Sequence, residues 1–337
     1  MKASTSKAGG GGHGLTFLNC IEGDLGLVES RLSDEIMSSV LTAKRAASHI
    51  LEAGGKRVRP ALVILSARAC SGEFVLEELI DIAASAELIH MASLMHDDVI
   101  DGSHWRRGRL TANAHWGNQA SVLTGDYILA RAFSLLARSG SSRVMEAIAE
   151  AAIAMSESEI RQIEIRREPN LPVESYMAVV LGKTATLMSA CCRVGAIFAS
   201  APSEQEQALA CYGKNLGIAF QITDDLLDLV GNPELTGKPV GSDIREGKVT
   251  LPIILTMRKA SQEDRLSIQR IISSGEVKAQ DIEFVCKTAR ETGAVDETRL
   301  AAAAHITRAE DALCALPPSK AVSSLRALAH YVLSRDR

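Results

Sequence analysis

The segment LEELIDIAASAELIHMASLMHDDVID, residues 76–101, places apolar residues three and four positions apart almost to its end, where aspartates replace them. This spacing is the period of an α-helix. Residues 144–165 and 173–198 repeat it, and the sequence nowhere alternates apolar and polar residues long enough to predict a strand. Helices that are apolar on more than one face pack at the centre of a bundle. We therefore predict one all-α domain over residues 21–337, a bundle of about ten to twelve helices.

The composition of the 337-residue chain agrees with this prediction. Hydrophobic residues make up 46% and aromatic residues only 4%, so Ala, Leu, Ile and Val must form the core. That amount of apolar material excludes a largely disordered chain. The net charge of −4 gives no electrostatic footprint for nucleic acid, and we expect no nucleic-acid partner.

The ends and the cysteines indicate where the protein works. The chain begins with Gly- and Ser-rich sequence that lacks the apolar run of a signal peptide, and we predict a disordered tail over residues 1–20. No stretch of about 18 apolar residues is free of charges, so we predict no membrane span. None of the seven cysteines forms a CxxC pair, which favours free thiols in a reducing compartment. We expect a cytoplasmic protein.

The first acidic cluster, HDDVID at residues 96–101, ends the apolar segment. At about 100° per residue, Asp97 and Asp101 lie about 40° apart around the helix, and Asp98 and Asp101 about 60° apart. Three converging negative charges at a helix C-terminus are unfavourable, so a positive group must compensate them. A solvated acidic helix end would explain this cluster equally well if it stood alone.

The second cluster, QITDDLLD at residues 221–228, repeats the order Asp-Asp-x-x-Asp late in another apolar helix, with Asp224, Asp225 and Asp228. Carboxylates without Cys or His at ligand spacing suit a hard cation, in particular Mg²⁺. Magnesium held by few carboxylates takes its other ligands from phosphate and water. Two such clusters facing each other therefore predict a diphosphate bridged by metal.

Three basic segments favour the same ligand. They are GGKRVRP (54–60), SHWRRGR (103–109), which directly follows the first cluster, and GKPVGSDIREGK (237–248), which follows the second. Arginine forks bind phosphate oxygens in pairs, and lysine supplies a point charge. Each segment alone would be explained by a solvated loop, but their positions beside the aspartates favour phosphate binding.

On these motifs the chain resembles the trans-isoprenyl diphosphate synthases, the polyprenyl synthetase family, and is most similar to the bacterial medium- and long-chain enzymes. The matching stretches, in the family's order, are GGKRVRP (54–60), LIHMASLMHDDVIDGSHWRRG (88–108), GKTATLM (182–188) and FQITDDLLDLVGNPELTGKPVGSDIREGKVTLP (220–252). The resemblance covers residues 21–335. It implies a mostly antiparallel bundle around a central cavity, and an Mg²⁺-dependent condensation of isopentenyl diphosphate with an allylic prenyl diphosphate.

The resemblance also implies roles for single residues. Asp97, Asp101 and Asp224 match the metal ligands, and Asp98, Asp225 and Asp228 match supporting acidic groups of the catalytic site. The positions that match the isopentenyl diphosphate site are Lys56, Arg59, His90 and Arg107. Those that match the surroundings of the allylic diphosphate are Arg106, Lys183, Thr184, Gln221, Lys238 and Lys248, of which Lys183 is also expected to act in catalysis. His90 lies seven residues before Asp97, two turns along the same helix face, which favours a role in the pocket over a buried structural one.

Residues before the first cluster predict the product. Ala92 and Ser93, five and four residues before Asp97, are small and leave a channel open. In this family bulky aromatic residues there resemble a stop for short products, so we predict a product longer than farnesyl diphosphate. A farnesyl- or geranylgeranyl-type short-chain synthase, the catalytic subunit of a heteromeric synthase, and a terpene cyclase-like lyase are the alternatives. The family is usually homodimeric, and a long product favours transient membrane contact for release.

Overall fold

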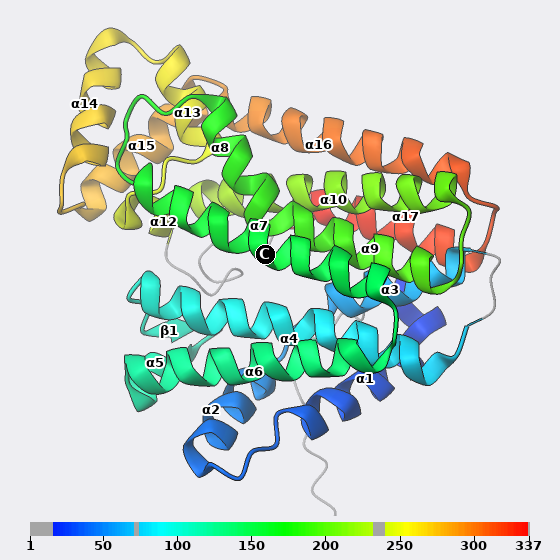
Figure 1. Ribbon diagram of the computed structural model, residues 1–337. Helices are drawn as coiled ribbons and strands as arrows, with labels where there is room; N and C mark the ends of the chain where they lie inside the picture. Colours follow the sequence, from blue (N-terminus) through cyan, green and yellow to red (C-terminus); the bar gives the residue numbers. More distant parts are fainter. Residues whose placement is uncertain (1–15, 71–73, 232–239, 336–337) are drawn as a thin grey trace, which may run out of the picture.

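The computed structural model describes residues 16–70, 74–231 and 240–335, and these residues confirm the all-α prediction (Figure 1). The first half contains α1 (Glu22–Glu35), α2 (Leu41–Glu52), α3 (Val58–Ala69), α4 (Leu76–Ile100), α5 (Ala112–Trp116), α6 (Asn118–Arg138) and α7 (Ser142–Glu164). The second half contains α8 (Val173–Val180), α9 (Thr186–Phe198), α10 (Ser203–Val230), α12 (Ser242–Glu246), α13 (Leu251–Lys259), α14 (Gln262–Ser273), α15 (Ala279–Glu291), α16 (Ala294–Ala312) and α17 (Lys320–Leu333).

Two long helices carry the acidic clusters. Helix α4 has 25 residues and packs against α3, α6 and α1, whereas α10 has 28 residues and packs against α9, α16 and α17. Figure 1 shows α4 and α6 side by side in the lower part of the bundle, with α10, α16 and α17 above them. Helix α4 ends at Ile100, and Gly102 follows with φ +62°, a conformation that glycine adopts without strain. Each cluster thus lies at the C-terminal end of its helix, the first on α4 and the second on α10.

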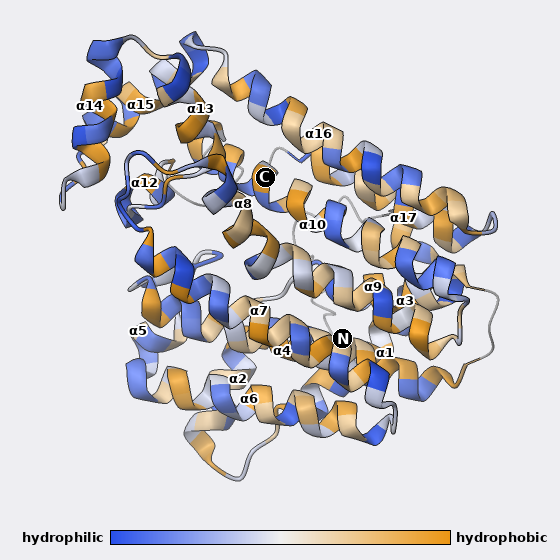
Figure 2. Ribbon diagram, turned by 45° about the horizontal axis from the view of Figure 1, so that its top comes forward, coloured by the Kyte–Doolittle hydropathy of each residue, from blue (hydrophilic) through white to orange (hydrophobic). Residues whose placement is uncertain are grey.

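Helix α4 is the predicted core helix, because most of its residues are buried on all sides, from Leu79 to Met95. Figure 2 shows hydrophobic and hydrophilic residues interleaved along outer helices such as α14 and α16, while the chain around α12 is mainly hydrophilic. The hydrophilic segment thus lies at the end of the bundle to which the acidic clusters point.

Residues 173–198 form one continuous helical segment, as predicted, but with an irregular turn inside it. Between α8 and α9, Leu181–Ala185 adopts a π-helical turn, which widens the helix by one residue per turn. Gly182 makes this possible on one side, because a Cβ there would lie 2.6 Å from the Cβ of Ser158 on α7. Gly217 does the same on the other side, since its Cβ would lie 2.6 Å from the Cα of Ala185. The turn is therefore wedged between α7 and α10.

A short hairpin follows α4 where the sequence predicted no strand. Trp105–Arg106 (β1) pairs antiparallel with Arg109–Leu110 (β2), and Arg107 and Gly108 turn the chain at φ 51° and 74°. Positive φ at both turn residues matches the twist of a two-residue hairpin. Strands this short show no alternation in the sequence, which explains why the prediction missed them.

The predicted tail needs one correction. Residues 1–15 lie outside the described residues, but Thr16–Ile21 forms a 3₁₀-helix, and Leu18 and Ile21 are buried against the bundle. The disordered tail predicted up to residue 20 is therefore wrong for residues 16–20, because burial of these two apolar side chains holds the segment. The prediction of free thiols is confirmed for all seven cysteines, none of which is in a disulfide.

Two helical segments, Asn118–Arg138 and Val173–Phe198, are long and apolar enough to cross a membrane by length and composition alone. In this structure they are elements of the bundle, with α6 packed on α4 and α9 packed on α3 and α10. Core helices of folded domains meet the same criterion, so these segments are explained by the packing that they already have.

Candidate active site

One cavity of about 970 Å³ opens between α4, α7 and α10 and receives side chains from both acidic clusters. It brings together nearly all of the residues singled out from the sequence. These are Asp97, Asp101, Asp224, Asp225, Asp228, Lys56, Arg59, His90, Arg106, Arg107, Lys183, Thr184, Gln221, Lys248, Ala92 and Ser93. Two are missing from this lining: Lys238 lies outside the described residues, and Asp98 is buried beside the cavity.

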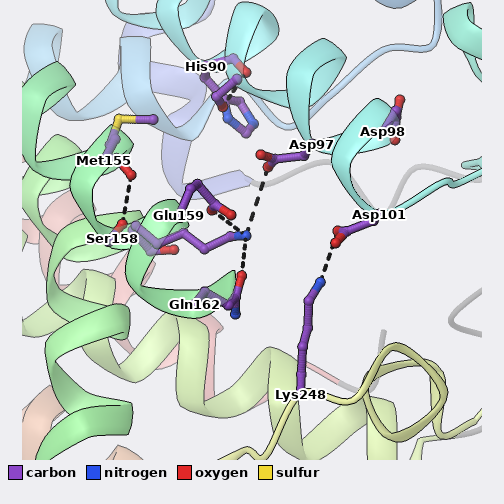
Figure 3. A network of polar contacts seen from close by, with 12 residues as sticks. His90, Asp97, Asp98, Asp101, Met155, Ser158, Glu159, Gln162 and Lys248 are labelled. Atoms are coloured by element: carbon purple, nitrogen blue, oxygen red, sulfur yellow. Dashed lines mark hydrogen bonds and ion pairs between the residues drawn. The ribbon is translucent and has the colours of Figure 1, made fainter. Parts of the chain in front are cut away.

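Asp98 holds an arginine instead of facing the cavity. Its carboxylate, 3% exposed, accepts hydrogen bonds from Nε and Nη2 of Arg106 at 2.9 and 2.8 Å. Figure 3 shows Asp98 directed away from Asp97 and Asp101. The expectation that Asp98 supports the site is thus met only indirectly, because it fixes the position of Arg106.

Asp101, at the end of α4, meets two cations from distant parts of the chain. Nη2 of Arg166 lies 3.1 Å from one carboxylate oxygen. Nζ of Lys248 lies 2.9 Å from the other (Figure 3). Burial lowers the pKa of Lys248, but Glu246, Asp101 and Asp243 outweigh burial and raise it. Lys248 is therefore fully charged at neutral pH, as the compensation of the acidic cluster requires.

The π-helical turn presents Lys183 to the first cluster. Its Nζ lies 2.5 Å from Glu159 and 4.0 Å from Asp97, and it donates a hydrogen bond of 3.1 Å to Gln162. In Figure 3 the labelled side chains of Asp97, Glu159 and Gln162 converge on one point. Burial raises the pKa of Asp97 to about 6, Lys183 opposes that rise, and the negative charges of Glu159 and Asp101 add to it.

The second cluster is held by different partners at each aspartate. Asp224 forms an ion pair of 2.7 Å with Nη2 of Arg335, whose guanidinium lies 4.3 Å from the ring centroid of Phe220. Asp228 accepts the backbone N–H groups of Ser242 and Asp243 at 3.2 and 3.1 Å, so it anchors the first turn of α12.

Asp225 lies deeper, only 6% exposed. It accepts hydrogen bonds from the Tyr176 hydroxyl at 2.6 Å and from the Gln221 amide at 2.8 Å. Burial raises its pKa to about 6, although both hydrogen bonds act in the opposite direction.

The loop before α3 and the hairpin turn form the basic wall. Arg57, at φ 49°, turns its buried guanidinium to Glu29 at 2.5 Å and Glu87 at 2.9 Å, which anchors the loop to α1 and α4. Arg107 donates a hydrogen bond to the carbonyl oxygen of Gly54, and Lys56 donates one of 2.5 Å to the Tyr331 hydroxyl. These contacts fix the cations of both segments at one side of the cavity.

Within the described part of the chain, Arg59 differs from the other cations of this wall in having a buried nitrogen without a partner. Burial lowers its pKa, and among the described residues no group accepts a hydrogen bond from its buried Nε. A buried, charged donor without an acceptor is costly. Its presence on the wall of a cavity is therefore explained by an anionic ligand that would accept the hydrogen bond.

His90 faces the same wall in its neutral form. Burial lowers its pKa well below the usual value, and the positive charges of Arg59, Arg107, Arg106 and Arg57 lower it further. The imidazole therefore contributes a hydrogen bond and not a positive charge.

The lining of the cavity also includes a set of small and apolar side chains. Ala92 and Ser93 share it with Ile89 of α4, Leu129 of α6, Met155 of α7 and Met188 of α9. Ala92 is 1% exposed. The Ser93 hydroxyl donates a hydrogen bond of 2.8 Å to the His90 carbonyl oxygen, so the serine side chain presents little polarity to the cavity.

Sequence reasoning missed several residues of the site. Glu159, Gln162, Arg166 and Arg335 stand in no motif, and only the packing of α7 and of the C-terminal end beside α4 and α10 brings them in. Asp243 could have been predicted as a site residue, because it lies in the basic segment after the second cluster. In that segment only the cations were considered. Burial and the charges of Asp228 and Asp225 raise its pKa well above the usual value.

The carboxylate groups that line the cavity indicate which metal ion the site could hold. Among the described residues, no three His, Cys, Asp or Glu side chains are grouped closely enough to hold an ion by themselves. Asp97, Asp101 and Asp224 nevertheless present carboxylates to one cavity, which suits a hard cation that takes further ligands from phosphate and water. The residues present therefore fit Mg²⁺ together with a diphosphate.

Comparisons with known proteins agree with this site. The family model described as polyprenyl synthetase matches residues 41–289. The chain is 38% identical over 314 residues to octaprenyl diphosphate synthase of Escherichia coli (strain K12), covering 93% of this chain and 96% of that protein. It is 37% identical over 313 residues to heptaprenyl diphosphate synthase component 2 of Geobacillus stearothermophilus, with coverage of 93% and 96%.

A solved structure extends the similarity to the fold. Polyprenyl synthase from Caulobacter crescentus CB15, complexed with calcium and isoprenyl diphosphate, has a TM-score of 0.93 at 34% identity. The comparison covers 96% of this chain and 98% of that one. The motifs and these similarities show that the chain belongs to the polyprenyl synthetase family and is a prenyltransferase.

Proposed function

We propose that this enzyme condenses isopentenyl diphosphate with an allylic prenyl diphosphate, with Mg²⁺, and makes a trans-polyprenyl diphosphate longer than farnesyl diphosphate. One observation carries the proposal: both acidic clusters and the basic residues face a single cavity that also has apolar lining. The charged part fits two diphosphates, and the apolar part fits a growing hydrocarbon chain.

Asp97, Asp101 and Asp224 would hold the metal. Bound Mg²⁺ would neutralise the negative charge that develops on the departing diphosphate. The relative from Caulobacter crescentus, which has the same fold, was solved with calcium and isoprenyl diphosphate, and this supports a divalent cation beside a prenyl ligand.

The basic residues divide into two sets. Lys183, Lys248 and Arg106 lie beside the aspartates and would stabilise the allylic diphosphate as its bond to carbon breaks and the electron pair stays on oxygen. Removing one such preorganised contact typically costs about 2.7–4 kcal/mol of transition-state stabilisation. Arg59, Arg107 and Lys56 form the other wall and would hold isopentenyl diphosphate.

The remaining steps need no dedicated base. The double bond of isopentenyl diphosphate attacks the allylic carbon, and the new cation then loses a proton to the released diphosphate. His90 is a poor proton acceptor, because burial and four arginines depress its pKa. The apolar wall keeps water away from the cation.

The proposal is tested with purified protein, Mg²⁺, isopentenyl diphosphate and each allylic primer in turn, followed by chromatography of the products. We expect product only with Mg²⁺, and none in the presence of EDTA. Asp97→Ala and Asp224→Ala should each lower turnover by more than about tenfold. Asp296→Ala, which changes an exposed aspartate of α16 outside the cavity, is the control. Turnover within tenfold of wild type for either cavity variant would refute the assignment.

We further propose that the protein acts as a homodimer. Two large apolar side chains outside the cavity are strongly exposed on α6 and α7, namely Leu123 (67%) and Ile153 (59%). A second copy covering this face would remove them from water. Light scattering should give a dimer that Leu123→Glu weakens, whereas Leu300→Glu, equally exposed on α16, should not. A monomer that is inactive alone would favour the catalytic subunit of a heteromeric synthase; the relative from Geobacillus stearothermophilus is itself named as component 2 of its synthase.

For location we propose the cytoplasm, with transient membrane contact when product leaves. Each added isoprene unit gains up to about 4 kcal/mol from burial at about 0.8 kcal/mol per CH₂, so a long product leaves slowly into water. Detergent or lipid vesicles should therefore raise steady-state turnover. Turnover that does not respond to either would argue against release as the slow step.

A further inference from the structure

Four side chains form a continuous hydrogen-bonded row behind the charged part of the cavity. The Thr184 hydroxyl donates to Oε1 of Gln221 at 2.7 Å, and Nε2 of Gln221 donates to Oδ1 of Asp225 at 2.8 Å. The Tyr176 hydroxyl donates to Oδ2 of Asp225 at 2.6 Å and ends the row. The row links α8, the π-helical turn and α10, three elements that carry no common motif.

The chemistry of the groups fixes the direction of every hydrogen bond. An ionised carboxylate only accepts, so Asp225 forces Gln221 to turn its NH₂ group inward and its carbonyl oxygen toward Thr184. That oxygen can only accept, so the proton of the Thr184 hydroxyl is committed to it. One rotation of Asp225 would disturb all three contacts.

Tyr176 supplies one of the two hydrogen bonds that oppose this rotation. It lies on α8 with 5% of its surface exposed, and it does not line the large cavity. Its hydroxyl binds one oxygen of Asp225 while Gln221 binds the other, so the carboxylate is held from both sides. Hydrogen bonds to a charged group are the stronger kind in proteins.

We propose that Tyr176 is a positioning residue of the allylic diphosphate site, which acts through Asp225 and Gln221 on Thr184 and on the turn that carries Lys183. The inference rests on the proposed function, in which Thr184 and Lys183 surround that diphosphate. It also assigns Asp225 to the orientation of Gln221 and leaves metal binding to Asp97, Asp101 and Asp224.

The experiment compares two buried tyrosines whose hydroxyl groups donate to different acceptors. Tyr212 is a matched control, because it is fully buried on α10 and donates a hydrogen bond of 2.7 Å to the Leu325 carbonyl outside the cavity. Tyr176→Phe and Tyr212→Phe each remove one buried hydroxyl. Binding of farnesyl thiodiphosphate, an unreactive allylic analogue, is measured by calorimetry with Mg²⁺, and the KM is measured for each substrate.

We expect Tyr176→Phe to weaken analogue binding and raise the allylic KM by about tenfold, as the loss of a hydrogen bond to a charged group predicts. The KM for isopentenyl diphosphate should stay within about twofold, because Arg59 and Arg107 do not depend on the row. Tyr212→Phe should change neither KM. Equal behaviour of the two variants, or an equal rise of both KM values in Tyr176→Phe, would overturn the inference.

A second variant keeps the test decisive if Tyr176→Phe folds poorly. Asp225→Leu has nearly the shape of aspartate but no acceptor for Gln221 or Tyr176, so Gln221 loses its fixed orientation and Thr184 its acceptor. It should reproduce the selective rise of the allylic KM, and normal values in this variant would refute the role of the row. An inactive wild-type enzyme would instead refute the proposed function, so the two failures are distinguishable.

Discussion

Ala92 allows the product length to be predicted from the shape of the cavity. The side chain is 1% exposed and lines the apolar part of a cavity of about 970 Å³ with Ile89, Leu129 and Met155. Its other surroundings are packed, so a phenylalanine at this position must direct its ring into the cavity. The ring is about the size of one isoprene unit, and we expect Ala92→Phe to shorten the product by at least one unit.

The magnitude follows from the burial that the last unit loses. An isoprene unit gains up to about 4 kcal/mol when it is buried, which corresponds to nearly a thousandfold preference for the longer chain. Without that gain, the enzyme should release the shorter chain almost exclusively. The assay is reversed-phase chromatography of the dephosphorylated products with mass detection.

Control variants distinguish a block of the cavity by the new side chain from other effects of changing residue 92. Ala92→Ser leaves the cavity open and should give the wild-type product. Ser93→Phe, from the neighbouring residue in the same lining, should also shorten the chain. An active Ala92→Phe enzyme with an unchanged product would show that the growing chain does not run past α4.

Two further predictions concern packing and protonation. Gly182→Ala would place a Cβ 2.6 Å from the Cβ of Ser158 and 2.8 Å from the Ala154 carbonyl oxygen, so the π-helical turn must move away from α7. We expect the free energy of unfolding, measured with urea, to fall by about 1–3 kcal/mol. Turnover, measured from initial rates, should fall as well. Gly23→Ala, which meets open space on α1, is the control, and a fully active Gly182→Ala enzyme would contradict the role of the turn. Because the pKa of His90 is lowered on folding, the unfolded chain binds the additional proton, and stability should fall as the pH drops below about 6.5. His90→Gln should remove up to about 1.4 kcal/mol of this loss per pH unit, and identical pH dependence of unfolding in both proteins would refute the shift.

The sequence predicted which chemical groups form the site better than it predicted the contacts between them. The two acidic clusters and the basic segments were predicted to share a diphosphate site, and every described residue assigned to that site, except Asp98, lines one cavity. Asp98 could not be separated from Asp97 by helical angle alone, because the difference comes from Arg106 in a hairpin that has no sequence signature. The direction in which α4 presents each carboxylate is set by its neighbours and not by its own period.

Contacts between distant segments were beyond the sequence for the same reason. Lys183 was expected at the allylic diphosphate, but no motif around it predicts its ion pair with Glu159 of α7. Nζ of Lys183 lies 2.5 Å from the Glu159 carboxylate. The ion pair of Arg335 with Asp224 joins the C-terminal end to the second cluster and depends on how α17 packs beside α10.

The sequence by itself determined that the chain is helical and which reactive groups it carries. Periodicity and charge spacing are local properties, and a hydrophobic repeat of about 3.6 residues defines a helix without knowledge of its partners. Only the tertiary structure decided which carboxylate meets which cation, how a π-helical turn brings Lys183 to Asp97, and how deep the apolar cavity runs. These depend on close packing between helices far apart in the chain, where a shift of one side chain changes the contact, and no local pattern records them.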